Sequence, residues 1–159
     1  MGSRSIIKLA YISGFLDGDG SLMFQLKKRK DGIFKFRFMT TICFYQDTRH
    51  EKTLYWIQEV LGIGYISRRK DGMTELRING FKQTRGILKN LLPYIQFKKL
   101  QASALLQACE VLSKTKFKKL VKKQLIKLVE NILVIQNENY VTKRKKTREE
   151  LFEILNLTP

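Results

Sequence analysis

The chain has 159 residues and a formal net charge of +17, because 31 Lys and Arg stand against 14 Asp and Glu. Apolar residues make up 43%, which excludes a disordered tail and is enough for one domain with a real core. No apolar run approaches the ~20 residues of a membrane span, and two cysteines without CxxC spacing argue against a zinc site and a disulfide scaffold.

So basic a surface favours a polyanionic partner, with nucleic acid as the leading class and an anionic membrane surface as its competitor. Free thiols indicate a reducing compartment. The opening MGSRS, residues 1–5, is interpreted as an expression remnant and is left out of the fold prediction.

Residues 6–18 have a helical pattern that ends in GFLDGDGS, residues 14–21. The C-terminal end of a helix carries partial negative charge, so an acid there is electrostatically misplaced. A plain turn accounts for the Asp-Gly pairs, whereas a bound cation would also account for the acids. An EF-hand loop starting at Asp17 fails, because its sixth and twelfth positions hold Leu22 and Lys28 instead of Gly and Glu.

Small residues follow one side of this first helix. Ala10, Gly14 and Gly18 fall nearly in line at about 100° per residue, with Ser13 beside them. Such a stripe lets another helix approach closely, either within the domain or as the same helix of a second subunit. In the second case two carboxylates and several free carbonyls converge, which requires a divalent metal, and hard oxygen ligands suit Mg²⁺.

Residues 21–29 and 33–45 alternate between apolar and polar side chains around the turn KDG, residues 30–32, which predicts a hairpin with one apolar and one cationic face. The inward set is Leu22, Phe24, Leu26, Phe34, Phe36, Phe38, Ile42 and Phe44.

Helices and a second hairpin are expected in the rest of the chain. Thr48 and Glu51 fit a capping box that opens a helix ended by Gly62. The order α-ββ-α-ββ-α predicts a mixed α+β domain with an antiparallel sheet. The further segments are a hairpin over 64–78 with its turn at 70–72, helices over 81–92, 98–112 and 117–136, and a last helix over 148–155 capped by Thr147 and Glu150.

The segment AYISGFLDGDG, residues 10–20, resembles the motif of the LAGLIDADG homing endonucleases, and the chain carries one copy. The element order and GIGY at 62–65 resemble the single-motif, homodimeric branch encoded in organellar introns. The resemblance covers residues 6–112, interpreted as the core domain, with 113–159 as a C-terminal helical extension of the same domain.

The resemblance implies a saddle-shaped sheet on DNA and a homodimer joined through Ala10, Ser13, Gly14 and Gly18. It implies a site-specific double-strand endonuclease that binds a long near-palindromic site and hydrolyses one phosphodiester per strand with divalent metal, leaving short 3′ overhangs. It also implies an intracellular protein of a chloroplast or mitochondrion.

Roles at the end of the motif helix follow from the same resemblance. Asp19 is the expected metal ligand, with the Gly18 carbonyl beside it. Mg²⁺ is the expected ion, with Mn²⁺ as a substitute and Ca²⁺ supporting binding without cleavage. Asp17 lies about 200° round the helix from Asp19, so it is interpreted as structural.

Three further positions match residues that surround the scissile phosphate in the family. Gln46 follows the first hairpin, and Lys98 matches the lysine, with Lys99 a near alternative. Where near relatives have Arg, this chain has His50, with Arg49 one residue earlier. Either residue lies at a helix N-terminus, which favours phosphate.

The polar face of the two hairpins is the expected DNA surface. At ~3.3 Å per residue, a nine-residue strand such as 21–29 spans ~30 Å, or roughly nine base pairs, so a dimer covers about twenty. Strand parity assigns to this face Met23, Gln25, Lys27, Arg29, Lys35, Arg37, Met39, Thr41, Cys43, Tyr45, Ser67, Arg69, Glu75 and Arg77.

Two alternatives from other classes stay open at this point. One is an intron maturase that binds RNA on the same fold without cutting DNA; the other is a basic ribosomal-type binding protein, which leaves the acid at the helix end unexplained. The roles of the basic segments 114–128 and 143–146 are also open.

Overall fold

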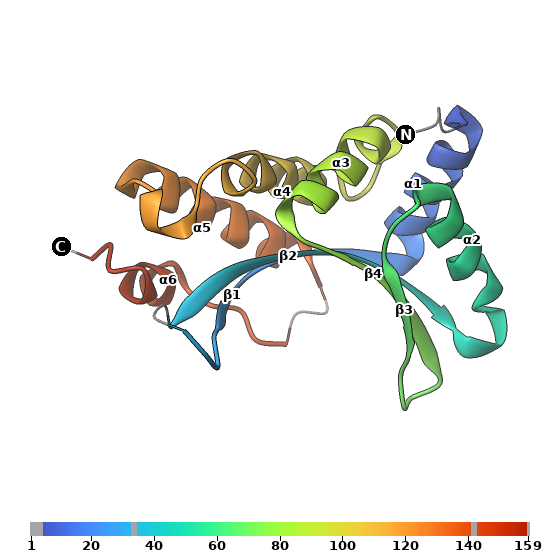
Figure 1. Cartoon of the computed structure of the whole chain (residues 1–159), viewed down its shortest axis with the longest axis horizontal. Helices are drawn as coiled ribbons and strands as arrows, with labels where there is room; N and C mark the ends of the chain where they lie inside the picture. Colours follow the sequence, from blue (N-terminus) through green and yellow to red (C-terminus); the bar gives the residue numbers. More distant parts are fainter. Residues whose placement is uncertain (1–4, 33–34, 141–142, 159) are drawn as a thin grey trace.

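A four-stranded antiparallel sheet, covered by helices on one face, forms the centre of the computed structural model, which describes residues 5–32, 35–140 and 143–158 (Figure 1). The elements are α1 (Ile6–Asp19), β1 (Gly20–Lys28), β2 (Phe36–Asp47), η1 (Thr48–His50), α2 (Lys52–Leu61), β3 (Tyr65–Arg68), β4 (Met73–Asn79), α3 (Phe81–Leu91), η2 (Leu92–Tyr94), α4 (Lys99–Leu112), η3 (Phe117–Lys119), α5 (Lys122–Glu138) and α6 (Arg148–Ile154).

The strand order is β1-β2-β4-β3, so the two hairpins lie side by side with β2 and β4 in the middle. β1 pairs with β2 from Gly20↔Phe44 to Lys28↔Phe36, and β2 pairs with β4 up to Asp47↔Met73. Figure 1 shows the two hairpins at opposite ends of the sheet, with α6 beside the β1–β2 hairpin. The expected α+β class and antiparallel sheet are confirmed.

The core lies between the sheet and the helices. Phe24 and Phe44 are almost fully buried, as are Ile12 and Leu16 of α1. The rings of Phe24 and Phe38 stack with centroids 5.5 Å apart. Burial of the alternate residues of β1 and β2 confirms the apolar face predicted for this hairpin, except at Phe34, which lies outside the described residues.

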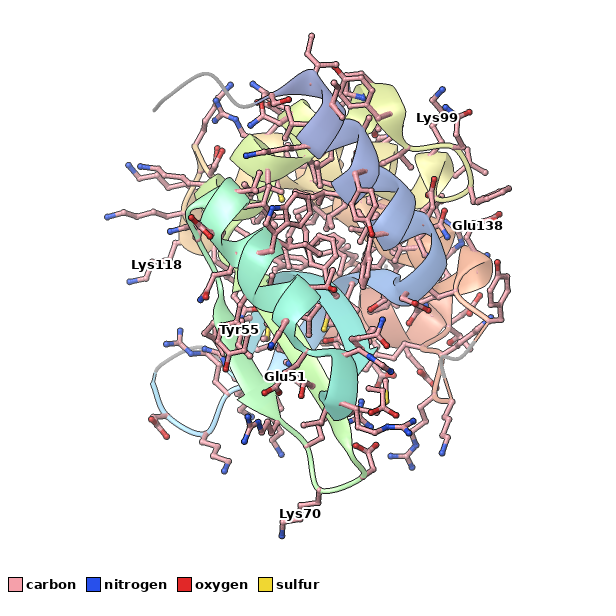
Figure 2. The ribbon with its side chains drawn as sticks, turned by 90° about the vertical axis from the view of Figure 1, so that its right-hand side faces the viewer. Glu51, Tyr55, Lys70, Lys99, Lys118 and Glu138 are labelled. Carbon is pink, nitrogen blue, oxygen red and sulfur yellow. The ribbon has the colours of Figure 1, made fainter. Side chains whose placement is uncertain are left out.

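The predicted capping box of Thr48 and Glu51 is wrong. The Glu51 carboxylate accepts hydrogen bonds from Arg68 Nε at 3.0 Å and from Thr74 Oγ1 at 2.8 Å, and the Thr48 hydroxyl bonds Thr74 Oγ1 instead of capping α2. Asp47 caps the short turn η1 in its place. Figure 2 shows Glu51 at the start of α2, above the β3–β4 hairpin, whose turn contains Lys70. Both side chains therefore join the helix to that hairpin.

The prediction of one continuous helix over 117–136 is also wrong. The chain forms η3, continues in extended conformation through Leu120 and Val121, and begins α5 at Lys122. Phe117 packs against Phe38, with ring centroids 5.7 Å apart, and Leu120 is buried. Gln124 Oε1 accepts the Val121 N–H at 3.0 Å and so satisfies a backbone donor where α5 begins.

The last helix, α6, has the capping box predicted from Thr147 and Glu150: the Thr147 hydroxyl accepts from the Glu150 N–H at 3.1 Å. Among the described helices, none is long and apolar enough to cross a membrane.

Gly64 and Gly86 provide a matched pair for a stability test. Gly64 has φ +105°, and a Cβ there would lie 2.7 Å from Leu76 Cδ1 and 3.0 Å from the Arg77 carbonyl. Gly86 lies inside α3, where a Cβ would meet nothing within 4 Å. In urea unfolding we expect Gly64→Ala to lower the free energy of unfolding by about 1–3 kcal/mol. Gly86→Ala should raise it by up to about 1 kcal/mol. Equal effects of the two changes would contradict the backbone conformation at Gly64.

Candidate functional site

The two aspartates at the end of α1 have different surroundings. The Asp17 carboxylate accepts backbone N–H bonds from Gln96 at 2.8 Å and from Lys98 at 3.0 Å, so it lies against the loop that precedes α4. Asp19, the last residue of α1, is exposed, and within the described residues its side chain has no hydrogen bond or ion pair. Asp19 is therefore the acid of this pair that is available to an external ligand.

Lys98 lies beside Asp17 and Asp19 at this helix end. Its ammonium donates to the Asp17 backbone carbonyl at 2.5 Å, where the negative end of the helix dipole favours a cation. Burial lowers the pKa of Lys98, and the nearby charges of Asp17 and Asp19 oppose that shift. The structure thus brings two of the sequence-predicted site residues, Asp19 and Lys98, to one place.

Gln46 lies at the same end of the β1–β2 pair. Gly20, the residue after Asp19, pairs with Phe44, and Gln46 follows two residues later on β2. Gln46 is half-buried, and its Oε1 accepts the Asp47 N–H at 2.9 Å. Its amide nitrogen has no hydrogen bond among the described residues.

Arg49 and His50, the two candidates for the basic position, differ in their partners. Arg49 Nε and Nη2 donate to the two oxygens of Asp47 at 3.0 and 2.9 Å, and the Arg49 N–H donates to the same carboxylate at 2.9 Å. His50 is exposed and makes no ion pair with any described residue. The charge of Arg49 is therefore partly compensated by Asp47. The sequence analysis did not predict this pair, although Asp47 directly follows the candidate site residue Gln46.

The residues assigned by parity to the DNA surface lie on the sheet face that the helices leave uncovered. Gln25 pairs with Met39 and Lys27 with Arg37, so their side chains line the same face. The other strand members follow the same alternation: Met23, Thr41, Cys43, Tyr45, Ser67, Glu75 and Arg77, whereas Arg29, Lys35 and Arg69 lie just beyond the strand ends, next to the hairpin turns.

Three of these residues have almost no surface of their own. Thr41, Cys43 and Glu75 are 2%, 0% and 8% exposed, because neighbouring side chains cover them. Burial also raises the pKa of the Cys43 thiol. Direct contact with a ligand at these positions would require those neighbours to move.

Glu75 holds two of the arginines on this face. Its carboxylate is 3.0 Å from Arg69 Nη1 and 3.0 Å from Arg77 Nε, and Asp71 holds Arg69 Nη2 at 2.6 Å. Arg37, in contrast, is exposed and has no such partner among the described residues. Arg69 and Arg77 are therefore each paired with an acid, whereas Arg37 has no acidic partner among the described residues.

The small-residue stripe on α1 faces outward, with one exception. Ala10, Gly14 and Gly18 are exposed, and a Cβ added at either glycine meets nothing within 4 Å. The prediction that Ser13 belongs to the interface is wrong, because Ser13 is fully buried within its own chain. Its hydroxyl lies 2.8 Å from the Leu9 carbonyl oxygen and 3.0 Å from the Leu91 carbonyl oxygen, and it donates to them. The chain's own packing gives no reason for glycine at 14 and 18.

Exposed apolar side chains lie on the same side of α1 as the glycines. Ile7 is 81% exposed and Tyr11 59%, and the Tyr11 ring contacts Trp56 edge-on at 5.5 Å. A helix face that combines exposed apolar groups with bare glycines suits close packing against another helix.

One chain alone does not offer a complete metal site. Within residues 5–32, 35–140 and 143–158, no group of three or more His, Cys, Asp or Glu gathers at one point. The end of α1 supplies one free carboxylate, Asp19, and the carbonyls that a helix end leaves without intrahelical partners. These hard oxygen donors fit Mg²⁺, provided that a second copy adds its own.

Comparisons with known proteins agree with this geometry. Residues 12–112 match the family described as LAGLIDADG endonuclease. DNA endonuclease I-CvuI of Chlorella vulgaris is 36% identical over 110 residues, 69% of this chain and 68% of the relative. DNA endonuclease I-CreI of Chlamydomonas reinhardtii is 30% identical over 108 residues, 68% of this chain and 66% of the relative.

Two solved structures of I-CvuI also superpose well on this chain. The complex with its target Sro1.3 in 2 mM Ca has a TM-score of 0.84 at 29% identity and covers 95% of this chain and 94% of that chain. The complex with the I-CreI target C1221 in 2 mM Mg, in which the DNA is not cleaved, has a TM-score of 0.83 at 30% identity and covers 94% and 93%.

The Asp47–Arg49 pair leads to a pH prediction. Hydrogen bonds from the Arg49 side chain and N–H lower the pKa of Asp47 to about 2. Because the pKa is lowered, the pair persists above that value and is lost only as pH falls through it. In an NMR titration, the Asp47 carboxyl should not titrate above about pH 3, whereas Arg49→Ala should raise its midpoint toward about 3.9, though not fully, because the N–H of residue 49 still donates to the carboxylate. A midpoint near that ordinary value in the unaltered chain would contradict the pair.

Proposed function

The chain belongs to the LAGLIDADG endonuclease family, and on that basis we propose that two copies of it form one site-specific homing endonuclease that cuts both strands of DNA. The observation that carries the proposal is Asp19, a carboxylate without a partner in the described chain at the end of a helix whose exposed glycine stripe suits a second copy. The product would carry short 3′ overhangs.

The α1 helices would meet along Ala10, Gly14 and Gly18, with Ile7 and Tyr11 enlarging the contact. Their C-terminal ends then lie together, so the Asp19 carboxylates and Gly18 carbonyls of both copies surround one region. A divalent cation is needed there, since two uncompensated carboxylates would repel each other.

Mg²⁺ is the proposed ion, with Mn²⁺ as a substitute and Ca²⁺ supporting binding without cleavage. Asp19 and the Gly18 carbonyl would hold it. The chemistry it supplies when bound is the activation of water and the stabilisation of the leaving oxygen.

The chain's own side chains would prepare the phosphate and the water. Lys98 brings a positive charge next to Asp19 and would balance the charge that builds up on the phosphate. The free amide group of Gln46 would orient the attacking water. His50 would occupy the basic position, or Arg49 once it leaves Asp47.

The open face of the sheet would follow the DNA. Lys27, Lys35 and Arg37 are exposed on it and are suited to phosphate or base contact. Arg69 and Arg77 are held by Glu75 and would present a fixed pattern of donors to base edges. Two copies would cover about twenty base pairs as a near-palindrome.

A maturase that binds RNA without cutting DNA is the weaker candidate, because it does not use the free carboxylate of Asp19. An organellar compartment is our expectation for this protein; the two named relatives come from Chlorella and Chlamydomonas.

The decisive test is metal-dependent cleavage. A library of randomised sites of about 22 base pairs, which matches the expected span, is incubated with the protein and Mg²⁺, and the cut fragments are sequenced. We expect one near-palindromic site, with cleavage abolished by EDTA. No cleavage of any sequence with Mg²⁺ or Mn²⁺ would overturn the proposal.

On the selected site, Asp19→Asn should abolish cleavage while DNA affinity stays within about threefold, because the change removes a ligand of the ion but no base contact. Glu138→Gln is the control: it removes an exposed acid from the C-terminal end of α5, where the side chain has no ion pair with any described residue (Figure 2). An Asp19→Asn protein that cuts at the wild-type rate would contradict the assignment.

A second test concerns the dimer. Gly14→Leu adds a bulky side chain to the exposed stripe, where the chain's own atoms leave room, so the subunit should still fold. We expect sedimentation to show a monomer and cleavage of both strands to disappear. Gly86→Ala, which changes a helical glycine of α3 where a Cβ meets nothing within 4 Å, should stay dimeric. A Gly14→Leu dimer with full activity would place the interface elsewhere.

A further inference from the structure

We propose that Asp17 is a positioning residue that fixes the ammonium group of Lys98 beside the end of α1. The proposal rests on the catalytic role given above to Lys98, and it concerns how this chain holds that side chain in place. Asp17 itself would touch neither DNA nor metal.

The Asp17 carboxylate occupies the start of α4. Its oxygens accept the Gln96 N–H at 2.8 Å and the Lys98 N–H at 3.0 Å. Lys98 is the N-cap residue of α4, and its own side chain makes no capping hydrogen bond. The N–H groups at the start of a helix lack intrahelical partners and carry partial positive charge, so a carboxylate is favourable beside the Lys98 N–H; the Gln96 N–H lies in the loop before it. The Asp17 carboxylate is thus unfavourable at the negative C-terminal end of α1 but favourable beside the positive N-terminal end of α4.

The backbone of Asp17 holds the other end of the lysine. Lys98 Nζ donates to the Asp17 carbonyl at 2.5 Å. One residue therefore binds both the main chain and the terminal amine of Lys98. A lysine side chain is flexible along its four-carbon stem, and fixing both of its ends leaves few rotamers available.

The loop has little other anchorage around Lys98. Phe97 and Leu100 are 83% and 61% exposed, and Ile95 and Gln101 are the nearest buried residues on either side. The hydrogen bonds to Asp17 tie residues 96–98 to α1 across about 80 positions of sequence. Without them, the loop and the amine would move together.

An asparagine at 17 removes one acceptor and the negative charge. Its NH₂ group would face the N–H of Gln96 or Lys98, and two donors cannot bond each other. A misplacement of about 1 Å in a catalytic group can cost about 10²-fold in rate. We therefore expect Asp17→Asn to slow single-turnover cleavage of the selected site by about 10²-fold.

The cleavage rate, the DNA affinity and the melting temperature together distinguish a positioning role of Asp17 from a purely structural one. Under saturating protein and Mg²⁺, the rate per folded dimer should fall, whereas DNA affinity measured with Ca²⁺ should stay within about threefold, because Asp17 faces the loop and not the DNA surface. A merely structural role would lower the melting temperature and leave the rate of the folded dimer unchanged, and that result would overturn the proposal. Glu138→Gln should leave both the rate and the affinity as they are.

A double-mutant cycle with Lys98→Met tests whether Asp17 acts through Lys98. If it does, Asp17→Asn should cost less than about twofold in rate once Lys98 is methionine. A full additional loss in that background would overturn the inference and leave the role of Lys98 intact. A Lys98→Met protein that cuts at the wild-type rate would instead overturn the catalytic role of Lys98, and the inference with it. If Asp17→Asn does not fold, Asp17→Glu enters the same cycle, because it keeps the charge but displaces both acceptors by one methylene.

Discussion

A carboxylate at the negative end of a helix is stable only if a positive group meets it, and this constraint organises the site. Asp17 accepts the N–H groups of Gln96 and Lys98, just before α4, so the end of α1 is held to the start of α4 and the charge is partly compensated within the chain. The Asp19 side chain makes no hydrogen bond or ion pair with the described residues, although the charge of Lys98 acts on it. The same short motif therefore contains one acid that completes the fold and one that needs a ligand from outside.

The sheet separates stability from recognition by the same alternation of side chains. One face of β1 and β2 buries Phe24 and Phe44 under the helices, and the other face carries the cations. Because that second face is not filled by a core, acids rather than core packing hold two of its arginines. Glu75 does so for Arg69 and Arg77. An acid on this cationic face thus arranges the donors that surround it.

The structure of one chain also indicates that the functional unit is larger. Gly14 and Gly18 leave space that no atom of their own chain fills, and exposed Ile7 and Tyr11 border that space. Among the described residues, a single copy brings one carboxylate without a hydrogen bond or ion pair to the helix end. In the proposed dimer, subunit contact and metal binding would depend on the same helix, so a change that separates the subunits would also dismantle the ion site.

Local sequence patterns determined the class of fold, the two-sided hairpins and the motif at the end of α1, because side-chain alternation and turn residues act over a few positions. Tertiary structure alone decided which polar groups meet. Ser13 turns inward to the Leu91 carbonyl, and Asp17 binds the loop at Lys98. The same is true of Glu51, which joins a hairpin instead of capping its helix. These contacts link segments that are distant in the chain, and their partners depend on how the helices and sheet pack, which no short pattern encodes.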